Sequence, residues 1–339
     1  MQLTFILLRE KRGKYMEYLL LILGFVLLIK GADFFVDGSS SVAKLLKVPS
    51  IIIGLTVVAF GTSAPELSVS VTAALQGSND LAVGNVIGSN IFNLLMVLGC
   101  CAIMSPVRTD ESMLKKEFPF SIFITVVLLL LNSDFSLSKV LAGDEFFVLG
   151  RAGGVLLLML FGMFLYSTIR TALDARKGNE NVEEDDDEYK VLSPIKSAIY
   201  IVGGLIGIVW GGDLVVESAS AIALTFGWSQ AFIGLTIVAI GTSLPELVTS
   251  VVAAKKGETD LAVGNVVGSN IFNVLLILGV SSVISPIRLE VTAIYDTVIL
   301  IVASVFVYIT ALTKREIKRG EGVLCVLLYA IFFVYVLMR

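Results

Sequence analysis

Long apolar stretches alternate with short charged or turn-rich breaks along nearly the whole chain. A helix that crosses the hydrocarbon core of a bilayer needs about 20 predominantly apolar residues, and the stretches are of about that length. The pattern therefore predicts an all-α, multi-pass membrane protein. We expect ten transmembrane helices, near residues 17–36, 49–74, 81–105, 118–133, 146–169, 195–216, 229–254, 261–284, 292–312 and 321–338.

The two halves of the chain repeat one another. A shift of 180 residues superimposes 54–106 on 234–286 without a gap, and 34 of the 53 aligned positions are identical. Each copy holds five predicted helices, and an odd number makes the second copy enter the membrane from the opposite side, as in the inverted repeats of secondary transporters. We divide the chain into an N-terminal extension (1–15), a first five-helix repeat (16–170), a linker (171–194) and a second five-helix repeat (195–339).

Composition supports the membrane class and excludes several functions. Hydrophobic residues make up 56% of the chain and charged residues 16%, with a mean hydropathy of +0.91, whereas soluble domains carry roughly 25% charged residues. Histidine is absent, which excludes imidazole metal sites and histidine proton relays. We expect no enzyme activity, no resident cofactor and no nucleic-acid partner, and a protein that functions as a monomer in the lipid bilayer.

Basic residues predict the orientation. With residue 17 outside, sixteen lysines and arginines gather on the cytoplasmic side, as the positive-inside rule requires. The N-terminus then lies outside and the linker lies in the cytoplasm. The basic residues before position 15 contradict this rule, so we expect translation to start at Met16. The acidic run 183–188 is typical of a solvated linker, and a regulatory cation-binding role is the alternative.

Glu66 and Glu246 are the candidates for chemistry. Each lies in the middle of an apolar stretch, at the same place in its repeat, and an ionisable group there costs at least about 2.5 kcal/mol. An inverted repeat would place the two side chains opposite one another. Two facing carboxylates in a low dielectric repel, so they either share protons in a hydrogen-bonded pair or bind a cation.

Oxygen-bearing side chains around both glutamates favour the cation. Pro65 and Pro245 precede the acids and free a backbone carbonyl one turn back. Sites rich in oxygen and free of sulfur and imidazole suit hard cations, and Ca²⁺ takes about 6–8 oxygen ligands. Na⁺ has a similar radius and half the charge, so one site can serve both. The hydroxyls and amides occur at matching positions in the two repeats, as Thr62, Ser63, Ser89 and Asn93 and as Thr242, Ser243, Ser269 and Asn273.

The sequence GTSxPE followed by GNxxGSNIxN, present twice at the same spacing, resembles the calcium/cation antiporter superfamily, specifically sodium/calcium exchangers of the prokaryotic type. The resemblance covers both halves. It implies ten transmembrane helices and exchange of Na⁺ for Ca²⁺ by alternating access, with the first and sixth helices sliding against the other eight. It also implies Glu66 and Glu246 as central ligands, together with the hydroxyls and amides named above and the carbonyls of Ala59 and Ala239.

One position departs from the family pattern, because some prokaryotic members carry an aspartate where this chain has Asn273. The motifs then supply two negative charges, which balance one Ca²⁺ or two Na⁺. The 3:1 stoichiometry that the resemblance implies would leave the carrier with three Na⁺ positively charged.

Two questions stay open at this level. A proton-coupled or K⁺-dependent exchanger of the same superfamily and a cation channel are the alternative functions. Four acidic residues near the ends of the first and sixth predicted helices are explained either by solvation at the interface or by a place in the ion path: Asp33, Asp37, Asp213 and Glu217.

Overall fold

The computed structural model describes residues 14–77, 79–131, 146–178, 191–228, 237 and 239–338. The first half contains helices α2 (Lys14–Leu46), α3 (Ser50–Ile53), α4 (Ala59–Thr62), α5 (Ala64–Leu75), α6 (Asn79–Ile91), α7 (Leu98–Met104), α8 (Phe118–Leu130) and α10 (Arg151–Gly178), with π-helical turns η1 (Gly54–Val58), η2 (Phe92–Val97) and η3 (Met113–Glu117). The second half contains α11 (Pro194–Thr225), α13 (Ala239–Gly241), α14 (Leu244–Lys255), α15 (Thr259–Phe272), η6 (Asn273–Ile277), α16 (Leu278–Ile284), α17 (Val291–Lys314) and α18 (Arg319–Met338).

The fold is a helical bundle with long apolar helices, as the sequence predicts. Among the described residues, seven helices are long and apolar enough to cross a membrane, and the bent pair Ser50–Thr62 and Ala64–Leu75 makes an eighth. The predicted spans 118–133 and 229–254 correspond to shorter helices, α8 with 13 residues and α14 with 12, and 229–236 lies outside the described residues. A multi-pass helical membrane protein is therefore confirmed, and the number ten stays a prediction.

Among the described residues, four short strands accompany the helices of this all-α fold. β2 (Phe146–Leu149) pairs antiparallel with β3 (Ile287–Glu290), and β1 (Val107–Arg108) pairs with β4 (Glu316–Ile317). The prediction that a helix begins at 146 was wrong, since α10 begins at Arg151. Aromatic and β-branched residues before Gly150 favour a strand there. The N-terminal extension 1–15 lies almost wholly outside the described residues, as does the acidic run 183–188.

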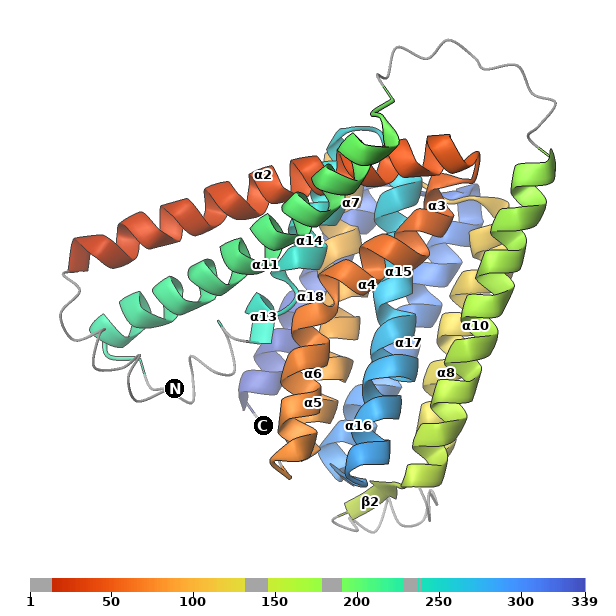
Figure 1. Ribbon diagram of the computed structural model, residues 1–339. Helices are drawn as coiled ribbons and strands as arrows, with labels where there is room; N and C mark the ends of the chain where they lie inside the picture. Colours follow the sequence, from red (N-terminus) through yellow and green to blue (C-terminus); the bar gives the residue numbers. More distant parts are fainter. Residues whose placement is uncertain are drawn as a thin grey trace.

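The bundle has two ends, which we name by their connections (Figure 1). The linker end is where α10 ends and α11 begins, at the top of the figure, and the β2 end carries the β2–β3 ladder at the bottom. Helices α5 and α14 run in opposite directions, α5 toward the β2 end and α14 toward the linker end.

Helices α2 and α11 lie side by side and run across the bundle at an angle to the other helices (Figure 1). Glycines bring their backbones together. A Cβ added to Gly204 would lie 2.6 Å from the backbone nitrogen of Phe35, and one added to Gly31 would lie 2.7 Å from that of Ile208. Both helices extend well beyond the predicted 17–36 and 195–216, and polar residues of the added segments, such as Ser39 and Ser218, are buried.

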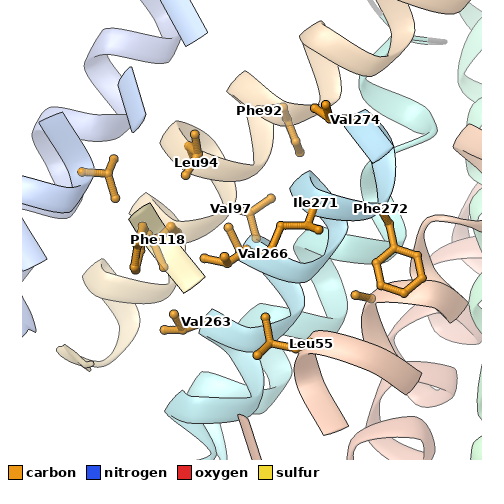
Figure 2. Close-up of a cluster of buried hydrophobic side chains, with 14 of the residues drawn as sticks. Leu55, Phe92, Leu94, Val97, Phe118, Val263, Val266, Ile271, Phe272 and Val274 are labelled. Carbon is orange, nitrogen blue, oxygen red and sulfur yellow. The ribbon is translucent and has the colours of Figure 1, made fainter. Parts of the chain in front are cut away.

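The remaining helices surround an apolar core in which the two repeats interlock. Figure 2 shows Leu55 from the first repeat beside Val263 and Val266 of α15, with Phe92 and Val97 of η2 nearby. No side chain separates α15 from α3 and η1, since a Cβ on Gly264 would lie 2.6 Å from the carbonyl oxygen of Ile51 and 3.0 Å from the Cα of Gly54. This close packing fixes α15 against the segment that leads into the first GTSxPE motif.

Candidate functional site

The GTSxPE motif breaks its helix in both repeats. Ser63 has φ −82° and ψ 7°, and Ser243 has φ −94° and ψ 7°, so each serine separates two helical segments. In the first repeat the two segments meet at a bend of 49°. Pro65 and Pro245 lie in the first turn of α5 and α14, where their missing N–H costs nothing. The break places each glutamate in the first turn of a new helix, where the helix dipole favours negative charge.

Glu66 and Glu246 are both fully buried, and each binds a serine of the other repeat. Ser243 Oγ donates to Glu66 Oε1 at 3.0 Å, and Ser63 Oγ donates to Glu246 Oε1 at 3.0 Å. The two hydrogen bonds are equivalent under the internal repeat. The structure therefore brings the two acidic residues predicted from the sequence into one buried cluster.

The second motif adds further oxygens around the same carboxylates. Ser89 Oγ of α6 lies 3.5 Å from Glu66 Oε1, and Ser269 Oγ of α15 lies 3.4 Å from Glu246 Oε1. Ser243 Oγ also lies 2.9 Å from Ser89 Oγ, so its single proton serves one acceptor at a time. The structure thus joins all four serines predicted from the sequence to the glutamate pair.

Thr62 and Thr242 bind asparagines that the sequence reasoning missed. Thr62 Oγ1 lies 2.9 Å from Asn265 Oδ1, and Thr242 Oγ1 lies 3.4 Å from Asn85 Oδ1. Asn85 donates to the backbone carbonyl of Glu66 at 3.3 Å. Each asparagine stands four residues before a site serine in the GNxxGSN motif, on the same helix face. This four-residue spacing could have identified both asparagines from the sequence.

The two predicted carbonyls have different surroundings. The carbonyl of Ala59 accepts the backbone N–H of Ser63 at 3.0 Å, and Thr62 Oγ1 lies 3.5 Å away. In the second repeat, the N–H of Ser243 donates to the carbonyl of Ile240 at 3.1 Å. Ala239 begins α13, next to residues that the structure does not describe.

Four oxygens of the predicted site are buried and have no hydrogen-bond partner among the described residues. They are Glu66 Oε2, Glu246 Oε2, Asn93 Oδ1 and Asn273 Oδ1. Leaving a buried acceptor without a donor costs about 1–3 kcal/mol, and more for a charged group. Both asparagines lie at π-helical turns, η2 and η6, which frequently mark functional sites. The arrangement is a set of acceptors that a cation would satisfy.

A cavity of about 340 Å³ adjoins the site on the side of the β2 end. Its walls come from α5, α11 and the start of α14, and include Pro65, Ser68 and Thr242. Asp213 and Glu217 of α11 line it as well and are exposed. The acidic pair near the end of the sixth predicted helix therefore borders the approach to the glutamates.

On the side of the linker end, the equivalent acidic pair is bound by a lysine. Lys256, in the turn between α14 and α15, lies 2.7 Å from Asp37 Oδ1 and 3.4 Å from Asp33 Oδ1. Its ammonium group also donates to the carbonyl of Asp33 at 3.0 Å. The residue equivalent to Lys256 in the first repeat is Gln76, which is exposed. The two approaches to the site therefore differ although the motifs match.

Fold and site together define a multi-pass membrane protein with a duplicated, oxygen-rich centre, and comparisons with known proteins identify the family. The family model described as "Sodium/calcium exchanger protein" matches residues 16–170 and 196–338. The chain belongs to this family and resembles its prokaryotic members within the calcium/cation antiporter superfamily.

Individual relatives agree with this assignment over nearly the full length. The chain is 41% identical to the putative antiporter CaxA of Alkalimonas amylolytica, over 91% of this chain and 94% of that protein. It is 36% identical to the sodium/calcium exchanger MaX1 of Methanosarcina acetivorans, over 94% and 97%. A structure of the sodium–calcium exchanger NCX_Mj, soaked with 2.5 mM Na⁺ and 10 mM Sr²⁺, matches with a TM-score of 0.77 at 33% identity, covering 94% of this chain and 98% of that chain. The chain is thus a transporter that exchanges Ca²⁺ for another cation.

Proposed function

We propose that the chain exchanges Na⁺ for Ca²⁺ by alternating access, with both ions bound in turn between Glu66 and Glu246. The observation that carries the proposal is the set of four buried oxygens without a donor, two from carboxylates and two from amides. A shared-proton pair of glutamates would leave the two amide oxygens unsatisfied, whereas a cation would satisfy all four. Ca²⁺ takes about 6–8 oxygens, which these atoms and the neighbouring hydroxyls can supply.

The proposed ligands come in matching sets from the two repeats. Carboxylates are supplied by Glu66 and Glu246, and hydroxyls by the threonine and serine of each GTSxPE motif and the serine of each GNxxGSN motif. Amide oxygens come from Asn93 and Asn273. Backbone carbonyls of Ala59 and Ala239 complete the set, as the family resemblance implies.

The charge of the site bears on the stoichiometry. Among the described residues, no group of three or more acidic, histidine or cysteine side chains is arranged to hold a metal ion, so the site carries two carboxylates. Two negative charges balance one Ca²⁺ or two Na⁺. A third Na⁺ would leave one positive charge on the carrier, and moving it across the membrane is worth about 2.3 kcal/mol per 100 mV.

Alternating access is supported by the difference between the two approaches to the site. The cavity beside Asp213 and Glu217 gives a route from the β2 end, and the ion pairs of Lys256 close the linker end. Because the repeats are inverted, exchanging their conformations would close the first approach and open the second. Helices α2 and α11, which line these approaches, are the elements that would slide.

The arrangement in the membrane follows the same proposal. Ten transmembrane helices form two five-helix repeats, 16–170 and 195–339, joined by the linker 171–194. The N-terminus and the β2 end face the outside, and the linker end faces the cytoplasm, in agreement with the distribution of basic residues. The unit of transport is the monomer, since both carboxylates belong to one chain.

The test is ⁴⁵Ca²⁺ uptake into proteoliposomes loaded with Na⁺, measured for the wild type, Glu66→Gln and Glu246→Gln. We expect uptake to depend on internal Na⁺ and to be lost in both variants, since glutamine keeps the shape and removes the charge. Replacing internal Na⁺ with K⁺ or with a proton gradient distinguishes the other coupling ions. Uptake that unlabelled Ca²⁺ inside the vesicles fails to accelerate would indicate a channel. Uptake retained in both variants would overturn the cation site.

A further inference from the structure

Four buried asparagines link the two repeats at the proposed cation site. We call them the asparagine bracket, and they are Asn90, Asn93, Asn270 and Asn273. Asn90 Nδ2 donates to the backbone carbonyl of Asn270 at 3.2 Å, and Asn270 Nδ2 donates to the backbone carbonyl of Asn90 at 3.2 Å. A carbonyl oxygen only accepts, so these contacts fix which end of each amide faces the other repeat. The oxygens of Asn90 and Asn270 must therefore point the other way.

Those oxygens accept hydrogen bonds from the two proposed ligands. Asn273 Nδ2 donates to Asn90 Oδ1 at 2.9 Å, and Asn93 Nδ2 donates to Asn270 Oδ1 at 3.2 Å. The NH₂ groups of Asn273 and Asn93 therefore point toward Asn90 and Asn270. The Oδ1 atoms of Asn93 and Asn273 are left buried, with no donor among the described residues. The backbone carbonyl of each repeat thus orients the amide of Asn90 or Asn270. That amide in turn orients the amide of Asn273 or Asn93.

We propose that Asn90 and Asn270 are positioning residues that keep the amide oxygens of Asn273 and Asn93 directed toward the transported cation. An amide has an oxygen and an NH₂ group of nearly equal size, and only the oxygen can bind a cation. Without Asn90 and Asn270, the amides of Asn273 and Asn93 could each turn by half a rotation and present the NH₂ group to the cation. The inference rests on the proposed function and assigns a role to residues outside the ligand set.

The bracket also joins the repeats across the site. Asn90 and Asn273 belong to different repeats, as do Asn270 and Asn93, so each ligand amide is oriented by the opposite half of the protein. Asn93 stands one turn after Ser89, which lies against Glu66, and Asn273 one turn after Ser269, which lies against Glu246. Any shift of α6 relative to α15 would therefore disturb both amides together.

A double-mutant cycle tests the positioning role, with the Ca²⁺ concentration for half-maximal ⁴⁵Ca²⁺ uptake as the readout. We expect Asn273→Ala and Asn90→Leu each to raise that concentration about tenfold or more. The double variant should need no more Ca²⁺ than the more affected single variant, because the effects of mutations within one hydrogen-bond network do not add. Asn93→Ala and Asn270→Leu form the matched second cycle and decide the question if a variant of the first does not fold. Thermal unfolding of each purified variant identifies such a case.

Effects that multiply in the folded cycles would show that Asn90 and Asn270 act independently of the ligands, and would overturn the positioning role. Glu66→Gln and Glu246→Gln are measured alongside. If they abolish uptake while the cycles are additive, the positioning role fails and the cation site stands. If they retain uptake, the proposed function itself fails.

Discussion

Lys256 of the second repeat binds Asp37 of the first, with its Nζ 2.7 Å from Asp37 Oδ1. The contact joins the turn between α14 and α15 to α2, one of the two helices that lie across the bundle. The position equivalent to Lys256 in the first repeat is Gln76. The ion pair is therefore a difference between two repeats whose motifs match.

Lys256→Gln is expected to favour the conformation that opens at the linker end. The lysine and both aspartates are partly exposed, at 22%, 31% and 35%, so the lost stabilisation is at most about 1 kcal/mol, or roughly a fivefold shift in population. A cysteine at Val248, the position equivalent to the cavity residue Ser68, reports the change. In a background without the native cysteines, its labelling by an impermeant maleimide from the linker end should become faster.

Gln76→Lys is the matched control, because residues 76, 213 and 217 are equivalent under the repeat to Lys256, Asp33 and Asp37. It should slow the labelling of a cysteine at Ser68 from the β2 end and leave Val248 unchanged or more reactive. Equal labelling rates in Lys256→Gln and the wild type would mean that the ion pair does not hold the linker end closed.

Gly204→Ala should slow exchange and lower thermal stability, whereas Gly203→Ala should do neither. A Cβ on Gly204 would lie 2.6 Å from the backbone of Phe35, so α2 and α11 would have to separate. At Gly203, nothing among the described residues lies within 4 Å of such a Cβ, and alanine stabilises an exposed helical position by about 0.5–1 kcal/mol. Uptake rate and unfolding temperature, measured for both variants, check the prediction. Two equally active and stable variants would contradict a close helix pair.

Sequence reasoning succeeded where a repeat constrained it. The apolar pattern and the duplication predicted the helical membrane class and the meeting of Glu66 with Glu246, because an inverted repeat places equivalent residues around one axis. Pro65 and Pro245 predicted a freed backbone carbonyl one turn before each glutamate, since proline acts locally, but the expected spans 49–74 and 229–254 did not include the breaks at Ser63 and Ser243. These features depend on short-range chemistry or on symmetry.

Features that depend on packing between distant segments escaped the sequence. The strand at 146–149 exists because residues 287–290 pair with it, and no local pattern specifies that partner. Asn90 and Asn270 act through each other across 180 positions of sequence. The ion pairs of Lys256 with α2 break the symmetry of the repeat, so reasoning from the repeat could not find them.

Asn273→Asp is expected to preserve exchange. In this variant a carboxyl oxygen takes the place of Asn273 Nδ2 and faces Asn90 Oδ1. Two oxygens at about the 2.9 Å of the present contact repel unless a proton lies between them. We therefore expect the aspartate to bind a proton and the half-maximal Ca²⁺ concentration to stay within about threefold of the wild type. Asn273→Leu, of similar size and without an oxygen, removes a proposed ligand and should raise that concentration about tenfold or more, which corresponds to about 1.4 kcal/mol. A tenfold gain in Ca²⁺ affinity in Asn273→Asp would indicate an ionised carboxylate and contradict this reasoning.

The equilibrium of exchange should depend on membrane potential if three Na⁺ move for each Ca²⁺. Glu66 and Glu246 supply two charges, so a carrier with three Na⁺ crosses the membrane with one net positive charge, whereas the Ca²⁺-loaded carrier is neutral. One charge is worth about 2.3 kcal/mol per 100 mV, so about 60 mV should change the equilibrium Ca²⁺ gradient tenfold. The measurement is the potential at which net ⁴⁵Ca²⁺ flux stops in proteoliposomes with fixed Na⁺ and Ca²⁺ gradients. A Ca²⁺ gradient that is indifferent to potential would rule out three Na⁺ and indicate that two Na⁺ balance the two carboxylates.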